Sequence, residues 1–294
     1  DSRDVVQICV FGAGATGGYL AVELVRAGCD VSVVARGPHL EATVANGLTL
    51  LIDGERRNVD VTATDDASTL GPQDYVIVTL KAHSISGVVD SLQPLLGPDT
   101  VVVSAVNGIP WWYCHGLDAP FGGRPLQSVD PGGIIWNGIG PERALGCVVY
   151  PSTEIAEPGV IRHLSDNKFS IGEPTGEKSQ RARRLADAFI EAGLKAPVRP
   201  RLRDEIWVKL WGNLAFNPLS VLTGATLDTL ATETGTREIA HAMMSEAQRV
   251  GEALGVRFGV NVDKRIAGAA AGGAHRTSML QDFELGRPLE SGAL

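Results

Sequence analysis

The sequence lacks both a long apolar run and a cluster of basic residues. No apolar segment in the 294 residues reaches the roughly 18 that a membrane-spanning helix needs. The formal net charge is −8, so we expect neither a nucleic acid nor a membrane surface as a partner. We find no signal peptide before the first expected strand and expect a cytoplasmic protein.

Cysteine is scarce as well. The four cysteines show no metal-ligand spacing, and we expect no metal site; they are Cys9, Cys29, Cys114 and Cys147. Cys9 falls within an expected strand, which favours a buried free thiol in a reducing compartment. The rest of the composition, 44% hydrophobic and 20% charged, is ordinary for a globular protein. The chain is long enough to form two domains.

A glycine-rich turn is the most informative stretch of the chain. The apolar run 8–11 predicts a buried strand, and a helical pattern extends to residue 26. Between them lies a G-x-G-x-x-G motif made of Gly12, Ala13, Gly14, Ala15, Thr16 and Gly17. With a second apolar strand at 31–35, this order predicts a Rossmann-type α/β domain whose helix N-terminus binds the phosphates of a dinucleotide. A glycine turn without a ligand is the alternative.

Each glycine of this motif has a separate expected role. Gly12 allows the tight turn out of the strand, and Gly14 lets a pyrophosphate approach the backbone. Gly17 lets the helix pack closely on the strand.

The residue after the second strand selects between NADH and NADPH. NAD sites usually carry Asp or Glu there, which binds the ribose 2′-hydroxyl. This chain has Arg36, whose guanidinium can pair with a 2′-phosphate, and no carboxylate adjoins it in sequence. An exposed arginine lying over the sheet edge is the alternative. We expect NADPH.

Two further polar residues follow expected parallel strands. Lys81 comes directly after an apolar strand at 74–80, and Asn107 after one at 100–106. Ligands of open α/β sheets lie beyond the carboxyl ends of the strands, so both side chains are candidates to meet a nicotinamide or its substrate. Each could instead simply begin a loop. The aromatic run 111–113 could either line a substrate pocket or pack the following loop.

The remaining pattern suggests two domains of different character. We expect a hairpin at 48–52 and 59–64, a helix at 88–96, a loop at 117–140 and a helix at 179–192. Strands of a more antiparallel kind are expected at 144–150, 159–163 and 169–171. Pro197 to Pro200 resembles a linker, so the expected domains are 1–199, which binds the cofactor, and 200–294, which is helical.

One helix of the second domain carries a polar stripe on an otherwise apolar surface. Lys209, Asn213 and Asn217 are spaced four residues apart and so share one helix face. A buried lysine without a partner is costly, so the stripe should face either a ligand or a buried carboxylate. Further along, we expect helices within 226–255, with a core face that includes Met243, Met244 and Val250, and a loop at 267–274.

Five motifs, in their order and spacing, carry a resemblance over nearly the whole chain. They are GAGATGG at 12–18, LKA at 80–82, VNG at 106–108, KLWGNLAFNPLS at 209–220, and TSMLQD at 277–282 followed by GRPLE at 286–290. Together they resemble the ketopantoate reductases, or 2-dehydropantoate 2-reductases. The resemblance implies a Rossmann domain joined to an all-helical domain, with the active site in the cleft between them, and NADPH-dependent reduction of a 2-oxo acid.

The same resemblance implies roles for individual residues. Lys209 matches the family's catalytic lysine, and Asn107 matches the asparagine on the side of the substrate and nicotinamide. Ser278 and Glu290 match a substrate-contacting pair. The matching positions also include Lys81 at the strand end, Asn213 and Asn217 on the helix, and Arg36 at the 2′-phosphate. Independently of the family, an ammonium at Lys209 is suited to stabilise the developing oxyanion and to donate the proton.

Two departures from the family pattern bear on the substrate. Leu227-Asp228 stands where pantoate-forming members often carry Asn-Gly, and the usual E-I-D block reads Glu290-Ser291-Gly292. Family chains also continue for a further helix or two, so we expect the second domain to be truncated. A bulkier 2-oxo or 2-hydroxy acid is therefore one alternative to ketopantoate, and a non-catalytic NADPH-sensing protein is another. A homodimer is plausible for a protein with a helical second domain.

Overall fold

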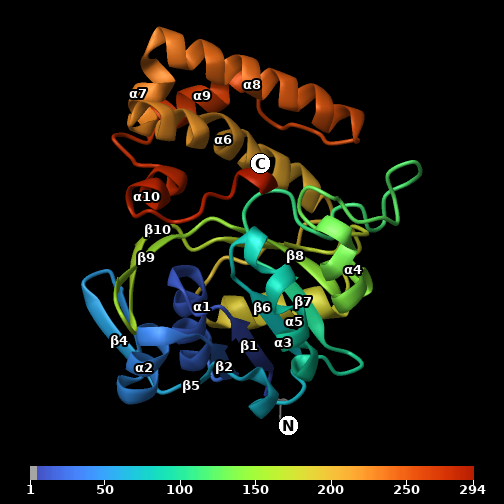
Figure 1. Ribbon diagram of the computed structural model, residues 1–294, viewed down its shortest axis with the longest axis vertical. Coiled ribbons are helices and arrows are strands. Elements are labelled where there is room, and N and C mark those ends of the chain that lie inside the picture. The colour runs from blue at the N-terminus through green and yellow to red at the C-terminus, as the bar shows by residue number, and fades with distance from the viewer. Residues whose placement is uncertain (1–4) are drawn as a thin grey trace. The chain divides into compact units, whose positions relative to one another are not determined.

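The computed structural model describes residues 5–294, and these form two compact units that divide after Leu202. The first unit is mixed α/β and the second is helical, as the sequence predicts. Figure 1 shows the elements of both units. Among the described residues, no helix is both long and apolar enough to cross a membrane.

A mostly parallel sheet forms the centre of the first unit. Within residues 5–294 its strand order is β11-β8-β7-β6-β1-β2-β5, and only the β8–β11 pair is antiparallel. The central strands are apolar and buried because helices cover both faces of a parallel sheet. The strands are β1 (Gln7–Phe11), β2 (Asp30–Val34), β5 (Thr62–Thr64), β6 (Tyr75–Val78), β7 (Val101–Ser104), β8 (Ala144–Val149) and β11 (Phe169–Gly172).

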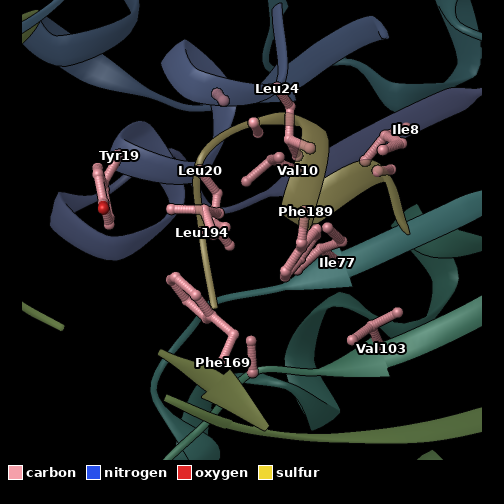
Figure 2. Packing of buried hydrophobic residues seen from close by; sticks show 14 of the residues in the cluster. Ile8, Val10, Tyr19, Leu20, Leu24, Ile77, Val103, Phe169, Phe189 and Leu194 are labelled. Atoms are coloured by element: carbon pink, nitrogen blue, oxygen red, sulfur yellow. The ribbon is translucent and has the colours of Figure 1, made fainter. Parts of the chain in front are cut away.

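One hydrophobic core joins this sheet to helices α1 (Ala15–Arg26) and α5 (Gln180–Glu191). Figure 2 shows the rings of Phe169 and Phe189 in this core, and they meet edge to face at 5.5 Å. Ser179 caps α5 by accepting a hydrogen bond from the N–H of Ala182 at 3.1 Å. The helix expected at 179–192 is therefore confirmed, with its start set by a side-chain cap.

A second, smaller sheet packs against α1. Its order is β4-β3-β10-β9, where β3 is Leu48–Ile52, β4 is Glu55–Val59, β9 is Ser152–Glu157 and β10 is Val160–Ser165. Gly18 of α1 faces Ile161, which a Cβ on Gly18 would approach to 2.5 Å. The buried carboxylate of Glu23 on α1 pairs with Arg57 of β4 at 2.8 Å. A close packing contact and an ion pair thus hold the small sheet on the helix.

Several predictions for the first unit were wrong in the extent or the pairing of an element. The hairpin is formed by β3 and β4, whereas residues 62–64 leave it and pair with β2 in the main sheet. The run 159–163 belongs to β10, which pairs antiparallel with β9, as expected of this run, and in parallel with β3. The strand β9 itself was not expected. The helix expected at 88–96 shrinks to α3 (Val89–Leu92), flanked by 3₁₀ turns. Pro94 supplies no N–H and so favours this early end.

The glycine- and proline-rich stretch 117–140 is not entirely a loop, because it contains α4 (Ile134–Ile139). The buried carboxylate of Asp130 accepts hydrogen bonds from the N–H groups of Ile135 and Trp136, both at 2.9 Å. This capping satisfies the first amides of a short helix that has no side-chain cap at its own N-cap residue, Gly133.

The aromatic run 111–113 is packed in the interior. Trp111, Trp112 and Tyr113 are each at most 3% exposed. The Trp111 indole N–H donates to the hydroxyl of Ser104 at 3.1 Å. A Cβ on Gly146 of β8 would approach the ring of Trp112 to 2.6 Å, so that glycine makes room for the indole. Of the two interpretations of this run, the packing one is supported.

The second unit is built on α6 (Leu202–Thr223), the helix with the polar stripe. Trp211, Ala215 and Phe216 of α6 pack against the other helices in one hydrophobic cluster, and the Trp211 ring stacks on Phe258 at 4.2 Å. The Trp211 indole N–H donates to the carbonyl of Met244 at 3.0 Å. The remaining helices are α7 (Leu227–Thr232), α8 (Thr234–Ala253), α9 (Val262–Ala271) and α10 (Ser278–Glu284).

Two expectations for this unit were wrong. Val250 is 51% exposed instead of facing the core, whereas Met244 on the same helix is fully buried. The loop expected at 267–274 is helical as far as Ala271, because α9 runs through the alanine- and glycine-rich stretch. Alanine is the strongest helix former, and this preference outweighs Gly268 within the run, whereas the helix ends before Gly272 and Gly273.

Candidate active site

The glycine turn has the geometry that the sequence predicts. Gly12 has φ +104°, in the region that favours glycine, and the N–H groups of Gly12 and Ala13 donate to the carbonyl of Val34 at 3.0 and 3.2 Å. Gly14 is the N-cap of α1, and no side chain caps this helix. The first amides of α1 are therefore available to an anion.

The space that a side chain of Gly14 would occupy is open. A Cβ built on Gly14 meets no atom within 4 Å, so the missing side chain leaves open space in front of the helix N-terminus. At Gly17 the opposite holds, because a Cβ there would lie 2.3 Å from the carbonyl oxygen of Gly12. One glycine thus keeps a face open and the other allows α1 to pack on the turn.

Thr79 supports the turn from the neighbouring strand, a role that the sequence reasoning missed. It follows β6, and its hydroxyl donates a hydrogen bond to the carbonyl of Gly12. Its N–H donates to the carbonyl of Phe11 at 3.1 Å. The sequence did contain a signal for this role, namely a hydroxyl-bearing residue at the end of an apolar strand, two residues before Lys81.

Lys81 and Asn107 lie at the same edge of the sheet as the glycine turn. They follow β6 and β7, and the strand order β7-β6-β1 places the three loops side by side at the carboxyl ends of parallel strands. Both residues are half-buried. This edge is where open α/β sheets bind their ligands.

Arg36 follows β2 and is the N-cap residue of α2 (Gly37–Asn46). Its side chain is exposed, and among residues 5–294 it makes no ion pair or hydrogen bond. The guanidinium is therefore available to an external anion, at the position that discriminates NADPH from NADH in Rossmann domains.

His39 of α2 also adjoins the turn and was not anticipated. Its Nδ1 accepts a hydrogen bond from the N–H of Gly159 at 3.0 Å, and its Nε2 is buried beside the backbone of Ala13. Burial lowers the pKa of this imidazole, although the backbone of Ala13 acts in the opposite direction. The ring therefore lies beside the glycine turn and is hydrogen-bonded to the β9–β10 connection.

In the second unit, α6 carries Lys209, Asn213 and Asn217 along one helix, as predicted. Lys209 and Asn213 are half-buried and Asn217 is 9% exposed. The sequence reasoning missed Arg265 of α9, whose guanidinium lies against Gly212, where a Cβ would be 2.6 Å from its Nη2. A second cation thus contacts α6 beside Asn213, and the missing side chain at Gly212 is what admits it.

The two predicted residues near the end of the chain lie on and after α10. Ser278 is the first residue of α10 and is exposed. Glu290 is half-buried and precedes the turn Ser291–Ala293. Just before Ser278, the hydroxyl of Thr277 accepts from the N–H of Leu280 at 3.1 Å and lies 2.6 Å from the hydroxyl of Ser220 on α6. This pair connects α6 with the start of α10.

The cysteines take no evident part in these arrangements. Within residues 5–294 none of the four cysteines forms a disulfide, and burial raises the pKa of Cys9 to about 12, with the hydroxyl of Ser32 acting in the opposite direction. The expected buried free thiol at Cys9 is confirmed. No cluster of His, Cys, Asp and Glu suited to a metal ion is found within residues 5–294.

A parallel sheet, an uncapped helix N-terminus after a G-x-G-x-x-G turn, and polar residues at the adjoining strand ends define a Rossmann-type oxidoreductase with a helical second domain. Comparison with known proteins gives its family. The family described as ketopantoate reductase PanE/ApbA matches residues 8–176, and its C-terminal domain matches residues 201–294. The chain belongs to the ketopantoate reductase family. It is an oxidoreductase acting on CH–OH groups, in a family of NADPH-dependent enzymes of pantothenate biosynthesis.

Individual relatives agree with this assignment. A 2-dehydropantoate 2-reductase of Mesorhizobium japonicum is 56% identical over 98% of this chain and 89% of its own. The crystal structure of a candidate ketopantoate reductase from Ralstonia solanacearum MolK2 has a TM-score of 0.93 and 42% identity, over 99% of this chain and 89% of its own. A D-mandelate dehydrogenase with NADH and anilino(oxo)acetate shares the fold, with a TM-score of 0.80 and 20% identity over 96% of this chain and 87% of its own.

Proposed function

We propose that this chain reduces ketopantoate to pantoate with NADPH, and that Lys209 is the general acid. The observation that carries the proposal is the open helix N-terminus at Gly14, which shares its sheet edge with Lys81 and Asn107. The 56% identity to a 2-dehydropantoate 2-reductase supports the choice of substrate.

The first unit, in this proposal, holds the cofactor. The first amides of α1 bind the pyrophosphate, since Gly14 leaves their approach open. Arg36 pairs with the 2′-phosphate, for which its exposed guanidinium has no competing partner among the described residues. Lys81 and Asn107 bind the nicotinamide half and the substrate beside it. When bound, NADPH supplies the hydride that reduces the C2 carbonyl of the 2-oxo acid.

The second unit supplies the proton and most contacts to the substrate. As the carbonyl is reduced, negative charge develops on its oxygen, and the Lys209 ammonium stabilises this charge and donates a proton from Nζ. Asn213, Asn217 and Ser278 bind the carboxylate and hydroxyl of the acid through neutral donors. Glu290 contacts the substrate and supports the charge of Lys209.

The buried aromatic run bears on the choice between ketopantoate and a bulkier acid. Because Trp111, Trp112 and Tyr113 are buried, and the indole of Trp111 is held by Ser104, their size does not by itself argue for a larger substrate. The departures from the family pattern at Leu227-Asp228 and after Glu290 remain, so the activity on ketopantoate has to be compared with that on bulkier acids.

The test is oxidation of NADPH by the purified protein, followed by absorbance. Ketopantoate is compared with bulkier 2-oxo acids, such as a phenyl-substituted one, at matched concentrations. We expect the highest kcat/KM with ketopantoate. A higher kcat/KM with a bulkier acid would identify that acid as the substrate in place of ketopantoate. NADPH binding without turnover on any 2-oxo acid would favour a sensing protein. The native mass of the same preparation tests whether the protein forms the homodimer considered from its sequence.

A further inference from the structure

Two buried hydroxyl groups in the second unit contact each other across two helices. Ser220 lies near the end of α6 and is fully buried, and Thr277, the N-cap of α10, is 6% exposed. Their oxygens are 2.6 Å apart. Ser220 also donates to the carbonyl of Asn217 at 2.7 Å, and Thr277 accepts from the N–H of Leu280 at 3.1 Å.

The direction of these hydrogen bonds follows from counting protons. A hydroxyl has one proton to donate and two lone pairs that accept. Ser220 gives its proton to the Asn217 carbonyl, so between the two hydroxyls Thr277 must be the donor. The result is one directed chain, from the N–H of Leu280 through Thr277 and Ser220 to the carbonyl of Asn217. Consecutive hydrogen bonds that point the same way polarise one another and gain strength.

This hydrogen-bonded chain connects the backbone of Asn217 with the first turn of α10, where Ser278 is the first residue. Asn217 and Ser278 are two of the residues to which we assign substrate contacts. We propose that Ser220 and Thr277 are positioning residues, which fix Ser278 relative to the amide-bearing face of α6. The inference rests on the proposed function, because it concerns where Asn217 and Ser278 hold the 2-oxo acid.

The kinetic test separates positioning from mere stabilisation. Contacts made equally to substrate and transition state change KM and not kcat. We expect Ser220→Ala to raise KM for ketopantoate about tenfold, with kcat within about twofold and NADPH affinity unchanged. A merely structural role would lower the active fraction, and hence kcat, without changing KM.

Three further variants make the test specific. Thr277→Val, which removes the hydroxyl, should raise KM like Ser220→Ala, and Thr277→Ser, which keeps it, should restore the wild-type value. Because the two hydroxyls act as one unit, the Ser220→Ala and Thr277→Val effects should not add in the double variant. The control is Thr223→Val, since Thr223 donates to the carbonyl of Leu219 at 2.7 Å within the same helix; its KM should not change.

A second measurement does not depend on activity. Hydrogen exchange of the Leu280 amide should be faster in Ser220→Ala than in wild type or Thr223→Val, because the acceptor Thr277 is no longer held. If Ser220→Ala does not fold, the Thr277→Val and Thr277→Ser pair decides by itself. Wild-type turnover with unchanged KM in both hydroxyl-deleting variants would overturn the positioning role and leave the proposed function standing. A wild-type protein that reduces no 2-oxo acid would reject the proposed function itself.

Discussion

The hydroxyl of Thr79 donates a hydrogen bond to the carbonyl oxygen of Gly12, where the chain leaves β1 for the glycine turn. The same residue bonds the carbonyl of Phe11 through its N–H, at 3.1 Å. The strand next to β1 therefore fixes the start of the turn through both its main chain and a side chain. The conformation that presents the α1 amides depends on this contact.

Removal of the Thr79 hydroxyl should weaken cofactor binding. In Thr79→Val the shape is retained, but the carbonyl of Gly12 loses a partner, at a cost of about 1 kcal/mol. We expect the dissociation constant for NADPH to rise by up to about fivefold, as measured by fluorescence titration. Thr79→Ser keeps the donor and should bind as wild type does. Identical affinities in the Val and Ser variants would show that the hydroxyl does not support the turn.

Alanine substitutions at Gly14 and Gly17 should differ in their effects on stability and on cofactor binding. A Cβ on Gly14 meets no atom within 4 Å and φ there is −69°, so Gly14→Ala should change stability by less than about 0.5 kcal/mol. Its NADPH affinity should fall at least about tenfold, because the methyl group occupies the approach to the α1 amides. Gly17→Ala places a Cβ 2.3 Å from the carbonyl oxygen of Gly12, and it should lose about 1–3 kcal/mol of stability as well. Thermal unfolding and cofactor titration on both variants provide the comparison.

Arg36 should discriminate between the two nicotinamide cofactors. A charge-assisted hydrogen bond to a phosphate contributes about 1.5–3 kcal/mol, so Arg36→Gln should weaken NADPH binding by roughly 10- to 100-fold. NADH, which has no 2′-phosphate, should bind as before. Arg56→Gln, at an exposed position of β4, is the matched control and should affect neither. Equal losses for NADPH and NADH in Arg36→Gln would rule out a 2′-phosphate contact.

His39 should make the stability of the protein sensitive to acid. Burial lowers its pKa in the folded state, below the value of about 6.5 in the unfolded chain. The unfolded state therefore binds more protons as the pH falls below about 6.5, and stability falls with pH down through the folded-state pKa. Protonation would also place a proton on Nδ1, which accepts the N–H of Gly159.

The substitution that tests this effect is His39→Asn, whose side-chain oxygen can replace Nδ1 as the acceptor and does not titrate. We expect its melting temperature to vary less than that of the wild type between about pH 7 and pH 5. His275→Asn changes an exposed histidine and should follow the wild-type curve. Parallel curves for the wild type and His39→Asn would contradict the assignment.

The sequence was most informative where one residue type has one physical role. The three glycines of the turn, the apolar strand before it and the four-residue spacing along α6 each predicted a local geometry that the structure contains. These features are local, because they depend on backbone freedom or on helical periodicity.

Features that depend on long-range pairing were harder to predict. Residues 62–64 read as part of a hairpin yet extend the main sheet, because the edge of β2 was available to them. His39 adjoins Ala13, and Ser220 meets Thr277, through contacts between segments distant in sequence. A sequence does not show which group a hydroxyl or an imidazole contacts, so these supporting residues could be identified only from the structure.

The most direct test of the account is single-turnover reduction of ketopantoate by wild type and Lys209→Ala, each saturated with NADPH. Lys264→Ala, at an exposed position of α9, serves as the control. Loss of the general acid should slow hydride transfer by about 10²–10⁴-fold, while NADPH binding stays at the wild-type value and Lys264→Ala remains fully active. An undiminished rate in Lys209→Ala would contradict the assignment of this ammonium as the proton donor.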